Sequence, residues 1–223
     1  MYRKMWMFLL FTVSMIAAGE ISAQIPDKEN LIKNGNFDSE KALTATKKGI
    51  RYQIGKNWQT MALIWSKDTK LRNKIFPLML VSVEKNSAEQ KNVIVIEHKA
   101  DIIQHLDKTG KPMLATYCTQ NVPWSGGDKP VEYMFKMKAN GNHGKLSVNR
   151  SVMLICNFKD GAGKKAKNTG KTLLRKFSVA PGKWQDVNTK VIIPPGTRNC
   201  EISICLYGVG KFAFDDICLE KIK

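Results

Sequence analysis

Residues 179–221 read VAPGKWQDVNTKVIIPPGTRNCEISICLYGVGKFAFDDICLEK. Apolar side chains recur there at every second position or in short continuous runs, most clearly over residues 191–193, 202–206 and 212–219. Period-two alternation and apolar runs shorter than a helix are typical of strands. Pro194-Pro195-Gly196 supplies a turn between the first two runs. The stretch therefore predicts consecutive strands joined by turns.

The same pattern extends toward the N-terminus. Further apolar runs cover residues 61–65, 76–83, 93–96, 133–137 and 152–158. Many short strands without a repeated helical pattern indicate an all-β chain folded as a β-sandwich. Residues 99–106 fit a helical turn or a strand equally well. Because no internal repeat, linker or break in composition interrupts the pattern, we expect a single domain.

The first 23 residues are predicted to be a signal peptide. Arg3 and Lys4 give a positive start, residues 5–18 are almost unbroken apolar, and Ala23 supplies the small residue at the cleavage site. The apolar run is shorter than the roughly 20 residues that a membrane-spanning helix needs. We expect cleavage after Ala23, so that the domain covers residues 24–223 and is secreted, periplasmic or held at the cell surface.

The chain is strongly basic. Its 223 residues include 36 Lys and Arg against 19 Asp and Glu, a formal charge of +17, while 43% of the residues are hydrophobic. This hydrophobic content excludes a disordered tail. Lysines gather around a Gly-rich turn at positions 164, 165, 167, 171 and 176. They suit an acidic polysaccharide or an anionic envelope surface, or they form a solvated face; we expect no nucleic-acid partner, because aromatic residues do not interleave with them.

Five cysteines follow the leader: Cys118, Cys156, Cys200, Cys205 and Cys218. An odd number means that at least one stays unpaired or pairs between molecules. Cys156 alternates with apolar residues and is expected to be buried. Cys200 and Cys205 should lie on opposite faces of one strand, too far apart to bridge each other, and any disulfide pairing stays open.

Two end segments and one middle segment carry a resemblance to a known family. Residues 30–40 read NLIKNGNFDSE, residues 118–141 contain Gln-x-Val before a Tyr-x-Phe strand, and residues 179–221 contain W-x-x-V, P-x-G-T and F-D-D-I-x-L in that order. Together they resemble the galactose-binding-like jelly-roll domains, and among them the carbohydrate-binding modules of families 4, 9 and 22. The resemblance implies a jelly-roll β-sandwich that binds a glycan.

The resemblance also implies a structural Ca²⁺ ion. In that family the ion joins the acidic residue after N-G-x-F to the terminal D-D pair, which here are Asp38 with Asp215 or Asp216. Carboxylate oxygens suit Ca²⁺. The alternative is that these aspartates bond to the backbone or to lysines without a metal.

Aromatic side chains are the candidates for sugar contacts, since sugar rings present apolar C–H faces that stack on Trp or Tyr. Trp124 stands in the polar stretch NVPWSGGD, which gives little reason to bury an indole, and it is the first candidate. The other candidates are Trp65, Tyr117, Tyr133 and Tyr207. Trp58 and Trp184 are expected in the core. The site lies either on a sheet face or at the loop ends.

No convincing catalytic group can be assembled. The seven-residue spacing of His98 and His105 matches no ligand motif, and the paired carboxylates of a glycosidase are not evident. Ile103-Gln104-His105 is similar to a segment of jelly-roll polysaccharide lyases, but the Tyr-Lys-rich partner is missing.

The sequence therefore predicts a secreted, non-catalytic carbohydrate-binding protein that takes an acidic polysaccharide and associates with an envelope partner or a glycoside hydrolase. The alternative is an envelope interaction or adhesion module that keeps the fold without sugar binding, and a polysaccharide lyase is a minor alternative. The first two classes differ in whether an exposed aromatic groove exists.

Overall fold

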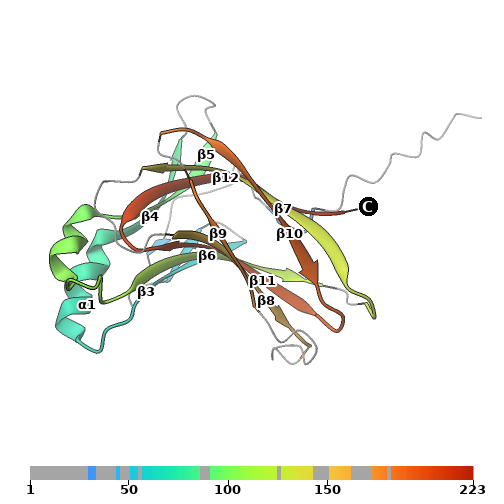
Figure 1. Cartoon of the computed structure of the whole chain (residues 1–223), viewed down its shortest axis with the longest axis horizontal. Helices are drawn as coiled ribbons and strands as arrows, with labels where there is room; N and C mark the ends of the chain where they lie inside the picture. Colours follow the sequence, from blue (N-terminus) through green and yellow to red (C-terminus); the bar gives the residue numbers. More distant parts are fainter. Residues whose placement is uncertain are drawn as a thin grey trace, which may run out of the picture.

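In a computed structural model of the chain, two antiparallel sheets pack face to face (Figure 1). The structure describes residues 30–33, 44–45, 51–54, 57–85, 91–124, 127–142, 151–161, 172–179 and 182–222. Within these residues, a seven-stranded sheet has the order β1-β2-β3-β6-β11-β8-β9 and a five-stranded sheet has the order β10-β7-β12-β5-β4. The predicted all-β jelly-roll sandwich is confirmed.

The strands of the seven-stranded sheet are β1 (Thr44–Ala45), β2 (Arg51–Ile54), β3 (Trp58–Ile64), β6 (Leu114–Pro123), β8 (Ser151–Lys159), β9 (Leu173–Phe177) and β11 (Asn199–Tyr207). Those of the five-stranded sheet are β4 (Met79–Lys85), β5 (Asn92–His98), β7 (Val131–Asn142), β10 (Gln185–Ile193) and β12 (Gly210–Lys221). From β9 onward successive strands alternate between the two sheets, so the connections between these strands cross from one sheet to the other.

The core lies between the sheets and is built from alternate positions of their strands. Its largest fully buried side chains include Trp58, Tyr133, Phe135, Phe212 and Phe214. Trp58 is buried as predicted, whereas Trp184 is half-buried just before β10. Burial of this apolar surface is the main favourable contribution to folding.

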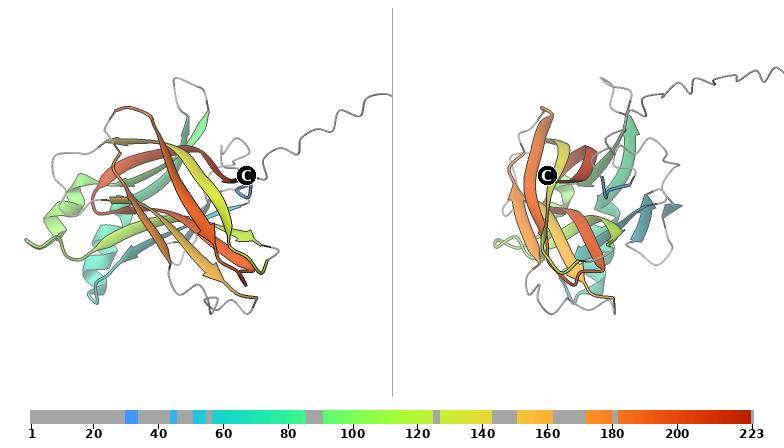
Figure 2. Two further views of the ribbon diagram at one scale, coloured as in Figure 1. Left: turned by 45° about the vertical axis from the view of Figure 1, so that its right-hand side comes forward. Right: turned by 90° about the vertical axis from the view of Figure 1, so that its right-hand side faces the viewer.

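Short helices close one end of the sandwich (Figure 2). They are α1 (Thr69–Ile75) and the 3₁₀ helices η1 (Phe76–Leu78) and η2 (Ala100–His105). Residues 99–106, predicted as either a helical turn or a strand, contain η2. The sequence analysis missed α1, which Asp68 begins by accepting hydrogen bonds from the Lys70 and Leu71 backbone N–H groups at 2.8 and 3.2 Å.

Residues of the N-terminal motif lie along the C-terminal strand and across to the other sheet. The Asn30 side chain accepts the Leu219 N–H at 3.0 Å. The buried Gln120 side chain of β6 holds both backbone groups of Lys33, each at 2.8 Å. Gln120 belongs to the Gln-x-Val element of the resemblance, so that element has a structural role here: it fixes the first described segment to the seven-stranded sheet.

All five thiols are free. Cys118, Cys156, Cys200 and Cys205 are buried, and Cys218 is half-buried. Cys200 belongs to the core cluster between the sheets, while Cys205 packs in a cluster on the other face of the seven-stranded sheet. The predicted burial of Cys156 and the opposite facing of Cys200 and Cys205 are therefore confirmed.

His98 connects the two sheets at the end of β5. Its Nδ1 donates to the carbonyl of Gly208, in the turn between β11 and β12, and its Nε2 accepts from the Thr116 hydroxyl of β6 at 2.7 Å. Because Nδ1 faces a carbonyl, the neutral imidazole that carries its proton on Nδ1 satisfies both contacts. A second proton, on Nε2, would remove the acceptor to which the Thr116 hydroxyl donates. Burial lowers the pKa of His98 to about 4, against the opposing effect of the Gly208 hydrogen bond.

We predict that this histidine makes stability depend on pH. Since the pKa is about 4 in the folded state and 6.5 ordinarily, the unfolded chain binds the proton more readily between these values. Stability is therefore unaffected above pH 6.5 and falls as the pH drops toward 4, by about 3 kcal/mol in all. Urea unfolding at several pH values measures this loss.

The matched variants are His98→Gln and His105→Gln. The first should flatten the pH dependence between pH 6.5 and 4, whereas the second should keep it. Equal slopes in the two variants would contradict the assignment.

Candidate functional site

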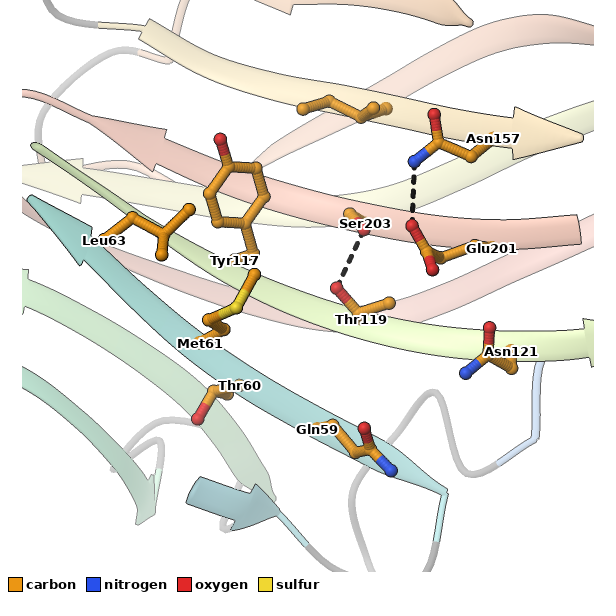
Figure 3. Close-up of a pocket in the computed structure, with 11 residues that line it drawn as sticks. Gln59, Thr60, Met61, Leu63, Tyr117, Thr119, Asn121, Asn157, Glu201 and Ser203 are labelled. Atoms are coloured by element: carbon orange, nitrogen blue, oxygen red, sulfur yellow. Dashed lines mark hydrogen bonds between the residues drawn. The ribbon is translucent and has the colours of Figure 1, made fainter. Parts of the chain in front are cut away.

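A groove of about 370 Å³ lies on the outer face of the seven-stranded sheet (Figure 3). Except for the buried Thr60, the side chains that line it occupy alternate positions whose neighbours along the strand point into the core. They are Gln59, Met61 and Leu63 of β3, Tyr117, Thr119 and Asn121 of β6, Ile155 and Asn157 of β8, and Glu201 and Ser203 of β11.

One end of the groove is apolar and aromatic. Leu63, Met61 and Ile155 lie near the ring of Tyr117, over a small cluster that includes the buried Ala115 and Cys205. The hydroxyls of Tyr117 and Tyr207 lie 3.4 Å apart. Burial and this hydrogen bond raise the pKa of Tyr117, so its hydroxyl stays protonated at neutral pH.

Beyond Tyr117, the ring of Trp65 stacks on that of Tyr207. Their centroids are 5.7 Å apart and their planes differ by 14°. Ala115, the cross-strand partner of both Leu63 and Tyr207, has a side chain small enough for the two rings to meet above it. Trp65 is 44% exposed, which leaves part of its indole open to a ligand.

The other end of the groove is polar. The hydroxyls of Thr119 and Ser203 lie 2.8 Å apart, and the Asn157 amide donates to Glu201 at 2.7 Å. Lys159 also binds Glu201, at 2.7 Å. Although burial opposes ionisation of Glu201, the hydrogen bonds from Lys159 and Asn157 hold the pKa of its carboxyl below its ordinary value.

The groove has an aromatic and aliphatic surface at one end. Amides, hydroxyls and one carboxylate lie at its other end. This combination suits a ligand that has both C–H faces and hydroxyl groups. Such a ligand stacks on rings and hydrogen-bonds to fixed polar groups. Glu201 is the acidic residue among those that line the groove.

Three of the predicted ligand residues come together here. Tyr117 of β6 lines the groove, and its hydroxyl lies near that of Tyr207 of β11. Trp65, which directly follows β3, stacks on Tyr207 beyond the groove lining. Tyr133, a weaker candidate, is fully buried in the core. The sequence analysis did not single out the polar residues Gln59, Thr119, Asn121, Asn157, Glu201 and Ser203. Their alternation within predicted strands was visible, but any solvent-facing sheet shows it.

Trp124 is not brought into this groove. It follows β6, is half-buried, and packs its ring edge-on against Tyr133, with centroids 5.4 Å apart and planes at 84°. Its backbone N–H donates to the Arg198 carbonyl at 3.0 Å. The polar neighbours in the sequence suggested an exposed indole, but the chain turns the ring toward the core cluster. Its role as a ligand platform stays a prediction.

Asp215 and Asp216 lie at a β-bulge of β12, where pairing with β7 shifts between Asp215 and Cys218. Asp216 has a φ of 48°, a conformation that aspartate tolerates better than most residues. Asp215 is buried, as alternation predicted for one of the pair, and its carboxylate accepts the Asp216 N–H at 2.7 Å. Asp38 lies outside the described residues.

The Asp216 carboxylate faces lysines. Its oxygens lie 3.2 Å from the Lys138 ammonium and 4.0 Å from that of Lys91. These lysines compensate the charge of the Asp216 carboxylate. Among the residues that the structure describes, no three His, Cys, Asp or Glu side chains gather as a metal site would require.

Ile103, Gln104 and His105, the segment similar to a lyase, lie in and around η2 rather than in the groove lining. The described part of the chain contains no helix that is long and apolar enough to cross a membrane.

The chain matches no protein-family model and no curated protein sequence. Solved structures share its fold at low identity. An enzymatically active tailspike domain of bacteriophage CBA120 is 14% identical with a TM-score of 0.55; the match covers 86% of this chain and 21% of the tailspike chain. This chain thus spans about a fifth of that protein.

Two carbohydrate-binding modules are also similar. One is TmCBM61, solved with β-1,4-galactotriose, at 14% identity and a TM-score of 0.48, covering 86% of this chain and 99% of the module. The other is the xylan-binding CBM22-1 domain of Paenibacillus barcinonensis Xyn10C, at 12% identity and a TM-score of 0.44, covering 88% and 96%. The chain has the jelly-roll β-sandwich fold that the sequence resemblance implied.

Proposed function

We propose that the chain binds a polysaccharide in the groove on the outer face of the seven-stranded sheet. The observation that carries this proposal is the succession of Trp65, Tyr207 and Tyr117 leading into a row of amide and hydroxyl groups. A sugar chain presents the matching surfaces, with apolar ring faces for the aromatic end and hydroxyls for the polar end.

The exposed aromatic groove favours sugar binding over the alternative of an adhesion module. An interaction module without sugar binding needs no exposed indole beside a polar groove. The backbone of Trp65 is held by the hydrogen bond from its main-chain N–H to the Met113 carbonyl at 2.9 Å, and its ring is held by the stack on Tyr207. A fixed ring loses little conformational freedom when it binds a ligand.

We propose that binding is not accompanied by catalysis. Glycosidases use two carboxylic groups, one of which has a raised pKa so that it can donate a proton. Glu201 has a lowered pKa and already accepts from Lys159 and Asn157. It is therefore unsuited to the role of a general acid.

Export and an acidic ligand are finer proposals. The tripartite N-terminus supports export, and the charge of +17 supports a polysaccharide that carries acidic groups, with an envelope component or a glycoside hydrolase as a further partner. Basic side chains of the described surface, such as Lys176 on β9, lie outside the groove lining and would meet acidic groups there.

A structural Ca²⁺ ion is a further proposal. Asp215, which is buried beside the bulge, or the adjacent Asp216 would supply one carboxylate and Asp38 another. The resemblance of residues 30–40 and 212–219 to the family motif supports it.

Loss of the aromatic surface should abolish most of the binding. We expect Trp65→Ala and Tyr117→Ala each to weaken retention by about tenfold in affinity electrophoresis against a panel of soluble polysaccharides, because an aromatic contact contributes about 0.5–1.5 kcal/mol beyond area burial. Ile192→Ala is the matched control, because Ile192 is 48% exposed on β10 of the other sheet. Equal retention of Trp65→Ala, Tyr117→Ala and Ile192→Ala would refute this site.

The same assay tests the platform role of Trp124. Since its ring packs against Tyr133, we expect Trp124→Ala to lower the melting temperature. If the groove alone holds the ligand, the folded variant keeps its retention, whereas the predicted platform role requires that retention is lost. A folded Trp124→Ala protein that no longer binds would instead place Trp124 in the site.

Calcium binding should raise the melting temperature. An ion that binds only the folded state adds about 2.7 kcal/mol at 100 times its dissociation constant. We expect millimolar Ca²⁺ to raise the midpoint of the chelated wild type but not that of Asp215→Asn. An unchanged wild-type midpoint would leave the aspartates with a purely structural role.

A further inference from the structure

Glu201 introduces a negative charge into a groove whose other lining side chains are uncharged. It stands on β11, opposite Asn157 of β8 and Asn121 of β6 in the strand register. Figure 3 shows its carboxylate at the polar end, directed toward Asn157. Any ligand that fills this end of the groove comes close to the Glu201 carboxylate.

The carboxylate is fixed in position by both of its oxygens. Oε1 accepts from the Asn157 amide and Oε2 from the Lys159 ammonium, each at 2.7 Å. The Asn157 carbonyl in turn accepts from the Thr172 hydroxyl at 2.9 Å. The Glu201 side chain is 26% exposed and that of Lys159 33%. This network keeps the carboxylate from swinging out of the groove when a ligand arrives.

The nearby positive charge, the ammonium group of Lys159, is already paired with Glu201. Lys159 does not line the groove, and its ammonium binds Glu201 directly. A sugar carboxylate placed at this end would meet the fixed carboxylate first, and it would find neutral hydroxyl and amide donors rather than an available cation. Like charges in a partly desolvated site repel, and such repulsion sets specificity more than affinity. A neutral sugar meets no such repulsion, and its hydroxyls can donate to Glu201.

We propose that Glu201 is a specificity-determining residue that admits uncharged sugar units to the groove and discriminates against carboxylated ones. This inference rests on the proposed function. It also places the acidic groups of an acidic polysaccharide outside the groove, where exposed lysines lie, while neutral units of the same chain occupy the groove.

The test uses pairs of polymers that differ in charge but share a backbone: highly methyl-esterified pectin against polygalacturonate, and hydroxyethylcellulose against carboxymethylcellulose. Retention is measured in 1 M NaCl, where the Debye length is about 3 Å, so that lysines far from the groove contribute little while contacts inside it are screened less. The quantity compared is the ratio of retention of the neutral to the carboxylated member.

Wild type should retain the neutral member of a pair more strongly. Glu201→Gln keeps the shape of the side chain but leaves Lys159 uncompensated beside the groove. The ratio should shift toward the carboxylated member by roughly three- to tenfold. The control is Glu132→Gln, which removes the same charge from an ion pair of 2.6 Å with Lys190 on the outer face of the other sheet. It should leave the ratio unchanged.

A wild-type ratio at or below one, or a folded Glu201→Gln protein with the wild-type ratio, would overturn the inference. If Glu201→Gln does not fold, the double variant Glu201→Gln/Lys159→Met removes both charges, and loss of discrimination is then expected. Retention of both members of a pair without discrimination contradicts only the role of Glu201. Failure of wild type to retain any of the four polymers, or any of the panel used above, removes the proposed function together with this inference.

Discussion

Strand alternation in the seven-stranded sheet is the constraint on which the groove depends. Each groove side chain except that of Thr60 stands between two buried residues of its own strand: Ser203 lies between Ile202 and Ile204, and Asn157 lies between Cys156 and Phe158. A slip of one residue would exchange the two faces of a strand, burying polar groups and exposing apolar ones. Packing between the sheets therefore fixes which side chains face the groove and in what register.

The outer faces of the two sheets differ in chemistry. On the five-stranded sheet, ion pairs join neighbouring strands: Lys190 with Glu132, Lys136 with Glu220, and Lys138 with Asp216, at 2.6, 2.8 and 3.2 Å. In each of these pairs the two charges compensate each other across neighbouring strands. On the seven-stranded sheet, rings, amides and hydroxyls occupy the corresponding positions, and the ion pair of Lys159 with Glu201 lies at one end of the groove. In the described sandwich, the groups that line the groove on the outer face of the seven-stranded sheet suit a neutral polar ligand.

The sequence predicts the strands well because alternation is a local property. The apolar runs fall within strands, except that the run at 61–65 ends one residue beyond β3 and the run at 76–83 begins with η1. The aromatic residues Trp65, Tyr117 and Tyr207 were candidates from their chemistry alone. Their meeting depends on which strands are neighbours, since β11 pairs with β6 across 76 to 92 positions of the chain. Cross-strand neighbours of that kind cannot be read from one sequence.

The sequence does not show which of the polar strand residues line the groove. Thr119, Asn157 and Ser203 alternate with apolar neighbours as the residues of any solvent-facing sheet do, so only their assembly around one cavity marks them. Trp124 shows the opposite case: its polar neighbours suggested exposure, whereas its half-buried ring packs against Tyr133, nine residues further along the chain. The burial of one carboxylate of the D-D pair was predictable from alternation. The β-bulge that follows Asp215 was not.

The most direct test is to observe where a sugar chain binds, by ¹³C-methyl-methionine NMR during titration with soluble fragments of a polysaccharide that retains the protein. Met61 lines the groove, while Met134 lies on the five-stranded sheet at a half-buried position of β7. The groove assignment predicts a saturable shift of the Met61 methyl signal with that of Met134 unchanged. A saturable shift of Met134 without any change at Met61 would contradict it.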